Sequence, residues 1–196
     1  MIENLIFDLG GVLFDEHNGT IVEPMRKAAA SEGQFMAMWT NIMLGRITMR
    51  ECYDILIRQN KANEEILAST MSYDFCLENL PPRQNMIEAV KALSRNYNVF
   101  ILSNATDTMR DYTSKQLAFL DDAHKIYSCD AGMMKPDLRL FRFVLNSFGL
   151  NPEKTAFFDD HQKNLCAAEL CGIKPILVVS DFRPDIPTIL NTITTT

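Results

Sequence analysis

The sequence predicts a protein of the α/β class, with a parallel sheet at its core and a group of helices inserted near the N-terminus. Two patterns predict the sheet: short apolar runs end at small or acidic residues, and amphipathic helical patterns lie between them. A third pattern predicts the insertion, because residues 16–83 contain several helical patterns and no convincing strand. We therefore expect residues 1–15 and 84–196 to form the core and residues 16–83 to form a helical subdomain.

Apolar runs rich in β-branched and aromatic residues predict the strands. Four principal runs occupy residues 5–7, 99–102, 156–158 and 176–179, and a weaker run at 125–128 predicts a fifth strand. The principal runs are followed at once by polar residues, namely Asp8, Ser103 and Asn104, Asp159 and Asp160, and Ser180 and Asp181. Ligands of an open parallel sheet bind outside the carboxyl ends of its strands, so we expect these side chains to meet at one edge.

Helical patterns separate these strands. Apolar residues recur at helical spacing in two clear examples, which are Met86, Val90, Leu93 and Tyr97, and Leu138, Phe141, Leu145 and Phe148. Each set places one apolar stripe on a helix, which suits packing on a sheet. The inserted interval predicts helices at 33–44, 48–59 and 63–71, with Thr48 and Glu51 as a capping box for the second.

The composition excludes several functional classes. The 196-residue chain has 47% hydrophobic residues and a net charge of −6. Residues 16–83 contain 7 Lys and Arg against 9 Asp and Glu, and the remainder contains 12 against 16. Since neither part is basic, the cationic stripe that neutralises nucleic-acid phosphates is missing, and we expect no nucleic-acid partner.

The distribution of apolar, Cys and His residues bears on location and on metal binding. No apolar stretch approaches the roughly 20 residues that span a bilayer, and no cationic segment precedes the short N-terminal apolar run, so we expect a cytoplasmic protein without a membrane partner. Five cysteines without CxxC spacing are expected to be small buried apolar residues. The three histidines are scattered, so any metal should have oxygen ligands.

The strand ends provide much of what hydrolysis of a phosphate monoester requires. Asp8 can act as a nucleophile, and the two glycines at positions 10 and 11 let the backbone turn sharply beside an anion. Asp159 and Asp160 add carboxylates to the same edge, and Mg²⁺ typically takes one or two such ligands from a protein.

Donors for the phosphate come from two other segments. Ser103 and Asn104, expected at a helix N-terminus, offer a hydroxyl, an amide and backbone N–H groups. Lys135, in a loop between Gly132 and Pro136, supplies the positive charge that offsets the carboxylates. Together these residues point to phosphoryl transfer from a small phosphorylated substrate.

Four motifs in chain order resemble those of the haloacid dehalogenase-like hydrolase superfamily. They are DLGGVL at 8–13, LSN at 102–104, GMMKPD at 132–137 and FFDDHQKN at 157–164. The match covers nearly the whole chain. The wording of the motifs resembles the phosphatase branch of the superfamily, which includes bacterial sugar-phosphate phosphatases. The resemblance implies a Rossmann-like sheet, a small helical cap inserted after the first motif, and Mg²⁺ as cofactor.

The resemblance also implies a role for each matching residue. It implies that Asp8 is nucleophile and metal ligand, that the Gly10 carbonyl and Asp160 are metal ligands, and that Asp159 supports the water shell. It further implies that Ser103 and Lys135 bind phosphate, that Asn104 binds substrate and that Asn164 orients the site.

Gly10 departs from the family pattern. Most phosphatases of this kind have an Asp at this position, which protonates the leaving alcohol and later activates water. A positioned acid or base typically contributes about 10²–10⁴-fold in rate, so its loss matters. Asp15, Glu16 or His17 could replace it, water or substrate could serve, or the substrate could carry a good leaving group, as sugar 1-phosphates and acyl phosphates do.

Two other functions remain open. A 2-haloacid dehalogenase also lacks the second Asp, because a halide needs no proton, although such enzymes do not need the Asp159 and Asp160 pair. The alternative from another class is a degenerate phosphate-binding or metal-binding module without turnover.

The inserted subdomain is expected to choose the substrate. Arg46, between Gly45 and Ile47, is a candidate specificity residue, although an ordinary solvated arginine explains it equally well. The methionines of this region and Trp39 are expected to pack the subdomain, since methionine fills irregular gaps. We expect a monomer or a weak homodimer.

Overall fold

A computed structural model describes residues 1–15, 22–59, 65, 69–70, 72–179, 189 and 191. Its sheet has five parallel strands in the order β3-β2-β1-β4-β5. In chain order these are β1 (Asn4–Phe7), β2 (Asn98–Ser103), β3 (Lys125–Tyr127), β4 (Thr155–Asp159) and β5 (Lys174–Leu177). The predicted α/β class is confirmed, and the chain crosses over to place β1 at the centre of a Rossmann-like sheet.

The predicted fourth principal strand was misplaced. β5 begins at Lys174 and ends at Leu177, whereas the apolar run predicted residues 176–179. Pro175 lies opposite Phe157 of β4 and lacks an N–H to donate. An edge strand tolerates this because, among the described residues, no strand pairs with its other side.

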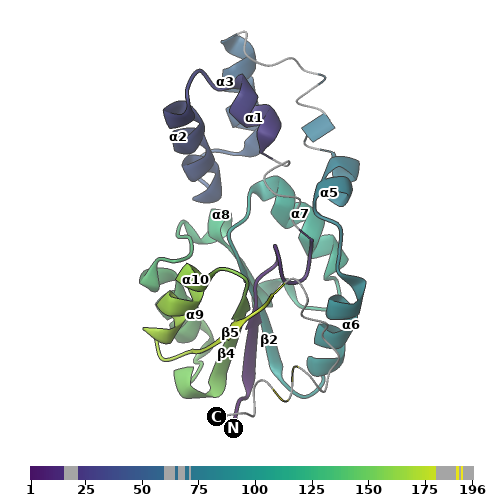
Figure 1. Ribbon diagram of the computed structural model, residues 1–196, viewed down its shortest axis with the longest axis vertical. Coiled ribbons are helices and arrows are strands. Elements are labelled where there is room, and N and C mark those ends of the chain that lie inside the picture. Colours follow the sequence, from purple (N-terminus) through teal and green to yellow (C-terminus); the bar gives the residue numbers. More distant parts are fainter. Residues whose placement is uncertain are drawn as a thin grey trace.

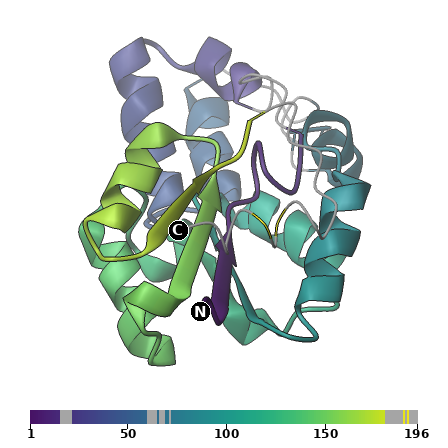
Figure 2. The same ribbon diagram turned by 60° about the horizontal axis from the view of Figure 1, so that its bottom comes forward.

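Helices cover both faces of the sheet (Figures 1 and 2). They are α6 (Gln84–Leu93), α7 (Asp107–Gln116), α8 (Ser128–Ala131), α9 (Leu138–Phe148) and α10 (Gln162–Glu169), with short 3₁₀ turns at Asp122–His124 and Pro152–Lys154. Along β1, Leu5 and Phe7 join one buried cluster with α6 and α7, whereas Ile6 joins the other with α9 and α10. The alternation of side chains along a strand thus serves two apolar layers.

The inserted region forms α1 (Glu23–Ala28), α2 (Glu32–Met43), α3 (Met49–Arg58) and α5 (Tyr73–Asn79). Helices α1 to α3, called the cap below, pack around their own apolar cluster and lie beyond the carboxyl ends of the strands (Figure 1). The capping box of Thr48 and Glu51 is confirmed at the start of α3. The helix predicted at 63–71 lies almost wholly outside the described residues, and the subdomain boundaries stay a prediction.

Two contacts seat the cap on the core. The backbone N–H of Met49, at the start of α3, donates to Oδ1 of Asp107 on α7 at 3.0 Å. Gly45, in the turn between α2 and α3, has φ of +64°, and a Cβ there would lie 1.8 Å from the carbonyl oxygen of Cys129 on α8. Only glycine allows two backbones to approach so closely, so the contact between the cap and the core requires glycine at position 45.

The cysteines are only partly as expected. Cys52 and Cys76 are buried, whereas Cys166 is exposed on α10 and Cys129 and Cys171 are partly covered. The expectation of five buried cysteines is therefore wrong for Cys166. Among the described residues, no helix is long and apolar enough to cross a membrane.

Candidate active site

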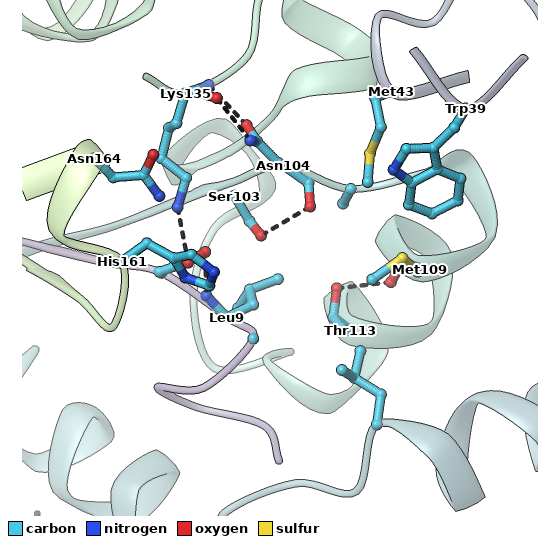
Figure 3. Close-up of a pocket in the computed structure, with 14 residues that line it drawn as sticks. Leu9, Trp39, Met43, Ser103, Asn104, Met109, Thr113, Lys135, His161 and Asn164 are labelled. Atoms are coloured by element: carbon cyan, nitrogen blue, oxygen red, sulfur yellow. Dashed lines mark hydrogen bonds and ion pairs between the residues drawn. The ribbon is translucent and has the colours of Figure 1, made fainter. Parts of the chain in front are cut away.

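The predicted site residues converge where the central strands end. β1 pairs with β2 on one side and β4 on the other, so the residues that follow Phe7, Leu102 and Phe158 are neighbours. A cavity of about 230 Å³ opens at this edge (Figure 3). Its polar wall is formed by the predicted residues Asp8, Gly10, Ser103, Asn104, Lys135 and Asn164 together with His161.

Lys135 is the electrostatic centre of the polar wall. Its Nζ lies 2.8 Å from Oδ2 of Asp8 and 2.7 Å from Oδ2 of Asp159. The Lys135 side chain is only 1% exposed, and the side chains of Asp8 and Asp159 are 10% and 0% exposed. One buried ammonium therefore bridges two buried carboxylates, which would otherwise repel each other.

Asn104 holds the backbone of Lys135 in place. Its Nδ2 donates to the carbonyl oxygen of Lys135 at 2.9 Å, and its Oδ1 accepts from the backbone N–H of Lys135 at 2.8 Å. This reciprocal pair gives Asn104 a positioning contact that sequence reasoning did not foresee, beside its place in the cavity wall. The expectation that Ser103 and Asn104 begin a helix is wrong, because α7 starts at Asp107 with Thr106 as its cap.

Asp159 is anchored from three directions. Beside the Lys135 contact, Nδ2 of Asn164 donates to both of its oxygens at 3.0 and 3.1 Å. The backbone N–H of His161 donates to Oδ1 at 2.7 Å. A carboxylate with this many donors is held rigidly.

Asp160 lies against the glycine turn that follows Asp8. A Cβ on Gly11 would stand 2.2 Å from Oδ2 of Asp160, and φ of Gly11 is +69°. Arg83 fixes the same turn, since its Nη1 donates to the Gly11 carbonyl oxygen at 2.6 Å. The missing side chain at position 11 thus brings the Asp160 carboxylate beside the Asp8 loop.

His161 was not singled out by the sequence. It lines the cavity, and its Nδ1 lies 2.6 Å from Oδ1 of Asp160. The hydrogen bond to Asp160 raises the pKa of His161. The adjacency of His161 to Asp159 and Asp160 in the sequence was the signal available for it.

Burial controls the ionisation of Asp8. Burial raises the pKa of Asp8 to about 6, with Lys135 acting in the opposite direction and Asp159 adding to the rise. The backbone N–H of Leu9 donates to Oδ1 of Asp8 at 2.7 Å and favours the charged form. A divalent cation at this carboxylate would also favour the charged form.

The oxygen-rich edge fits Mg²⁺. Asp8, the Gly10 carbonyl and Asp160 offer hard oxygen donors, and Asp159, Asp160 and His161 bring ligand atoms within 4.8 Å of one another. Mg²⁺ prefers carboxylate, carbonyl and water oxygens. The missing side chain at Gly11 lets the Asp160 carboxylate lie against the turn that follows Asp8.

The opposite wall is apolar and comes partly from the cap. Trp39 and Met43 of α2, Leu80 after α5, and Met109 of α7 line it (Figure 3). The expectation that Trp39 and the methionines only pack the cap is therefore wrong for Trp39 and Met43. It is also wrong for Met36, which is 48% exposed, and it is confirmed for Met25, Met38 and Met49, which belong to the apolar cluster of the cap.

Two tentative candidates lie away from the cavity. Asp15 forms an ion pair with Nε of Arg83, and Nη1 of Arg46 donates to Oδ1 of Asn41 on an exposed surface. Neither Asp15 nor Arg46 lines the cavity. Glu16 and His17, the other candidates for the missing acid, lie outside the described residues.

Two curated proteins resemble the chain along nearly all of its length. Drimenol cyclase drtB of Aspergillus calidoustus is 27% identical over 185 residues, which cover 90% of this chain and 34% of that protein. D-ribitol-5-phosphate phosphatase of Bacteroides thetaiotaomicron is 21% identical over 210 residues, covering 97% of this chain and all of that protein. The chain spans between a quarter and about a third of the length of the first curated relatives it matches.

A solved structure and a family model agree with the fold. A haloacid dehalogenase-family enzyme from Bacteroides thetaiotaomicron, crystallised with magnesium and inorganic phosphate, has a TM-score of 0.78 at 22% identity and covers 96% of this chain and 99% of its own. The family model of haloacid dehalogenase-like hydrolases matches residues 2–172, a segment that contains every residue of the polar wall. The chain therefore belongs to the haloacid dehalogenase-like hydrolases.

Proposed function

We propose that this hydrolase is a Mg²⁺-dependent phosphatase that acts on a small phosphorylated metabolite through an aspartyl-phosphate at Asp8. The observation that carries the proposal is the buried Lys135 ammonium, placed 2.8 Å from the Asp8 carboxylate and 2.7 Å from that of Asp159. A cation held at the nucleophile suits a substrate that brings negative charge to the site, as a phosphate does.

The first step follows from the position of Asp8. One carboxylate oxygen attacks phosphorus, a P–O bond to Asp8 forms, and the P–O bond to the substrate breaks. The leaving oxygen takes the bonding electron pair and a proton from solvent water, since Gly10 supplies no acid. Ser103 and Lys135 line the cavity beside Asp8, where hydroxyl and ammonium donors can hold the other phosphate oxygens as charge spreads over them.

Water completes the reaction. It attacks the phosphorus of the aspartyl-phosphate, the P–O bond to Asp8 breaks, and orthophosphate and the free carboxylate result. Lys135 stays paired with Asp159 throughout, so the ammonium remains in place when Asp8 is esterified and loses its charge.

Asp8, Asp160 and the Gly10 carbonyl are the residues that we propose hold Mg²⁺. When bound, the cation neutralises phosphate charge and holds the phosphate in line with the attacking oxygen. Two relatives support this part of the proposal: one is named for phosphatase activity, and the other was crystallised with magnesium and inorganic phosphate.

Gly10 is also compatible with a second function, a dehalogenase. No side chain at this position can protonate a leaving alcohol, but a halide leaves without a proton, so a dehalogenase needs no acid there. The oxygen-rich edge around Asp160 favours the phosphatase, since displacement of a halide by Asp8 requires no divalent cation.

The test measures phosphate release from esters and acyl phosphates with Mg²⁺ or with a chelator. We expect turnover that needs Mg²⁺ and that Asp8→Asn abolishes. Absence of Asp8-dependent phosphate release from the whole panel would refute the proposal. Chloride release from 2-chloropropionate without a divalent cation would establish the dehalogenase instead.

A further inference from the structure

The two walls of the cavity differ in chemistry. Nearly all of its charged and strongly polar groups lie on the sheet side around Asp8, whereas the facing wall is built from apolar side chains of the cap and of α7 (Figure 3). Trp39 and Met109 are only partly buried within their apolar clusters, so each leaves apolar surface free toward the cavity. A leaving group attached to a phosphate at Asp8 would meet this surface.

Two polar groups beside the apolar wall are already engaged within α7. The hydroxyl of Thr113 donates to the carbonyl oxygen of Met109 at 2.8 Å, and the N–H of Met109 donates to Oγ1 of Thr106 at 3.2 Å. Arg46 binds Asn41 on the exposed side of the cap. Among the described residues, therefore, no charged side chain faces the leaving group from the cap.

A second cavity of only about 10 Å³ lies behind this wall. Trp39 and Met109 separate it from the main cavity, and its other described lining residues are Met49, Thr70, Cys76, Thr106 and Thr108. None of these residues is charged. A zwitterionic leaving group would lose hydrogen bonds to water against the apolar wall and would meet no charged partner among the described lining residues, which costs binding free energy.

The dimensions limit the leaving group. The cavity of about 230 Å³ is smaller than the roughly 300–1,000 Å³ of typical ligand pockets. It has room for a phosphate and a compact group, and an aromatic ring can pack against Trp39 and the two methionine sulfurs, which make favourable contacts with rings.

Gly10 independently favours the same leaving groups. A phenol has a pKa of about 10, whereas that of water is about 15.7, so a phenolate leaves with far less help from an acid than an alkoxide does. An aryl phosphate therefore suits both the apolar wall and the absent acid.

We infer that the site selects phosphate monoesters with a compact, uncharged and mainly apolar leaving group, aryl phosphates foremost. This inference rests on the proposed phosphatase function and deepens it, because it assigns the cap residues Trp39 and Met43, with Met109 of α7, to recognition of the leaving group. Recognition here comes from burial of apolar surface, while the sheet side binds the phosphate.

Binding of phosphonates separates recognition from leaving-group reactivity, since their C–P bond does not break in this reaction. Trp39 is the chain's single tryptophan, so its fluorescence reports occupancy of the cavity. We expect phenylphosphonate to bind the Mg²⁺-loaded protein at least about tenfold more tightly than methylphosphonate. We expect 2-aminoethylphosphonate, whose substituent carries a charged ammonium group, to bind no more tightly than methylphosphonate.

Methionine-to-glutamine variants change polarity at nearly constant size. Met43→Gln and Met109→Gln should each reduce the preference for phenylphosphonate roughly fivefold or more, with orthophosphate affinity retained as the check on the polar wall. Met36→Gln is the matched control, because Met36 lies on the same helix as Met43, is 48% exposed and does not line the cavity. Trp39→Phe removes the only tryptophan, so its binding is measured by titration calorimetry, and it should retain part of the preference.

The outcomes separate this inference from the proposed function. If methylphosphonate and orthophosphate bind and phenylphosphonate gains nothing, or if neither glutamine variant changes the preference, the apolar selectivity is wrong while the phosphatase stands. If no phosphate or phosphonate binds with Mg²⁺ and no Asp8-dependent hydrolysis occurs, the proposed function fails and the inference fails with it.

Discussion

Replacing Lys135 with methionine tests the charge arrangement directly, because methionine has a similar length and no charge. At an effective dielectric constant of about 20, each contact of 2.7–2.8 Å contributes roughly 6 kcal/mol of gross attraction. Desolvation of the three ions offsets most of this. Removal of one member of a buried ion pair typically costs about 3–5 kcal/mol, since the remaining charges stay buried and unpaired. We therefore expect Lys135→Met to lower the free energy of unfolding by about 3–5 kcal/mol.

The surface pair of Lys154 and Glu3 supplies a matched control. Its Nζ to Oε1 distance is also 2.7 Å, but the two side chains are 43% and 57% exposed. Exposed pairs contribute about 0–1 kcal/mol, so Lys154→Met should barely change stability. Urea unfolding with a chelator present, which prevents a cation from replacing the ammonium, measures both variants. Equal stabilities of Lys135→Met and Lys154→Met would refute the assignment of Lys135 as a buried counter-charge.

Three further substitutions test the turns and the cap. Gly11→Ala should lower phosphate release by about 10²-fold or more, because the new Cβ would lie 2.2 Å from Oδ2 of Asp160 and displace the Asp160 carboxylate. A variant with full activity would contradict the proposed metal site. Gly45→Ala should raise the KM and make the cap more susceptible to limited proteolysis, because the new Cβ would lie 1.8 Å from the Cys129 carbonyl oxygen. Unchanged kinetics and unchanged cleavage would count against this contact between the cap and the core. Thr48→Ala should cost about 0.5–2 kcal/mol in thermal unfolding through loss of the α3 cap, and a change below 0.3 kcal/mol, roughly the error of the measurement, would contradict it.

The sheet and its polar edge could be predicted because both depend on local pattern. Apolar runs set the strands, and parallel pairing then brings their carboxyl ends together, so Asp8 and Asp159 had to be close once the class was known. The edge strand β5 was misplaced because Pro175 reads as a break in any local pattern. Whether an absent N–H matters depends on the neighbours of the strand, which only the assembled sheet shows.

Contacts that join distant segments were beyond the reach of local pattern. Asn104 and Lys135 are 31 positions apart, and their reciprocal backbone bonds arise only when the β2 loop meets the loop before α9. Motif order placed both residues at the site without showing that one holds the other. His161 was passed over for a similar reason, since its contact with Asp160 depends on the turn into α10.

The polar and apolar walls of the cavity therefore differ in how they are specified. The polar wall follows from strand register, which tolerates little change because a slip of one residue would turn each side chain to the other face. The apolar wall depends on how the cap is docked, through Gly45 against Cys129 and through Met49 against Asp107. A change in those two contacts would move Trp39 and Met43 relative to the polar wall. The apolar wall can thus change through the cap while the polar edge around Asp8 stays the same, which is why the polar edge could be predicted from motifs and the apolar wall could not.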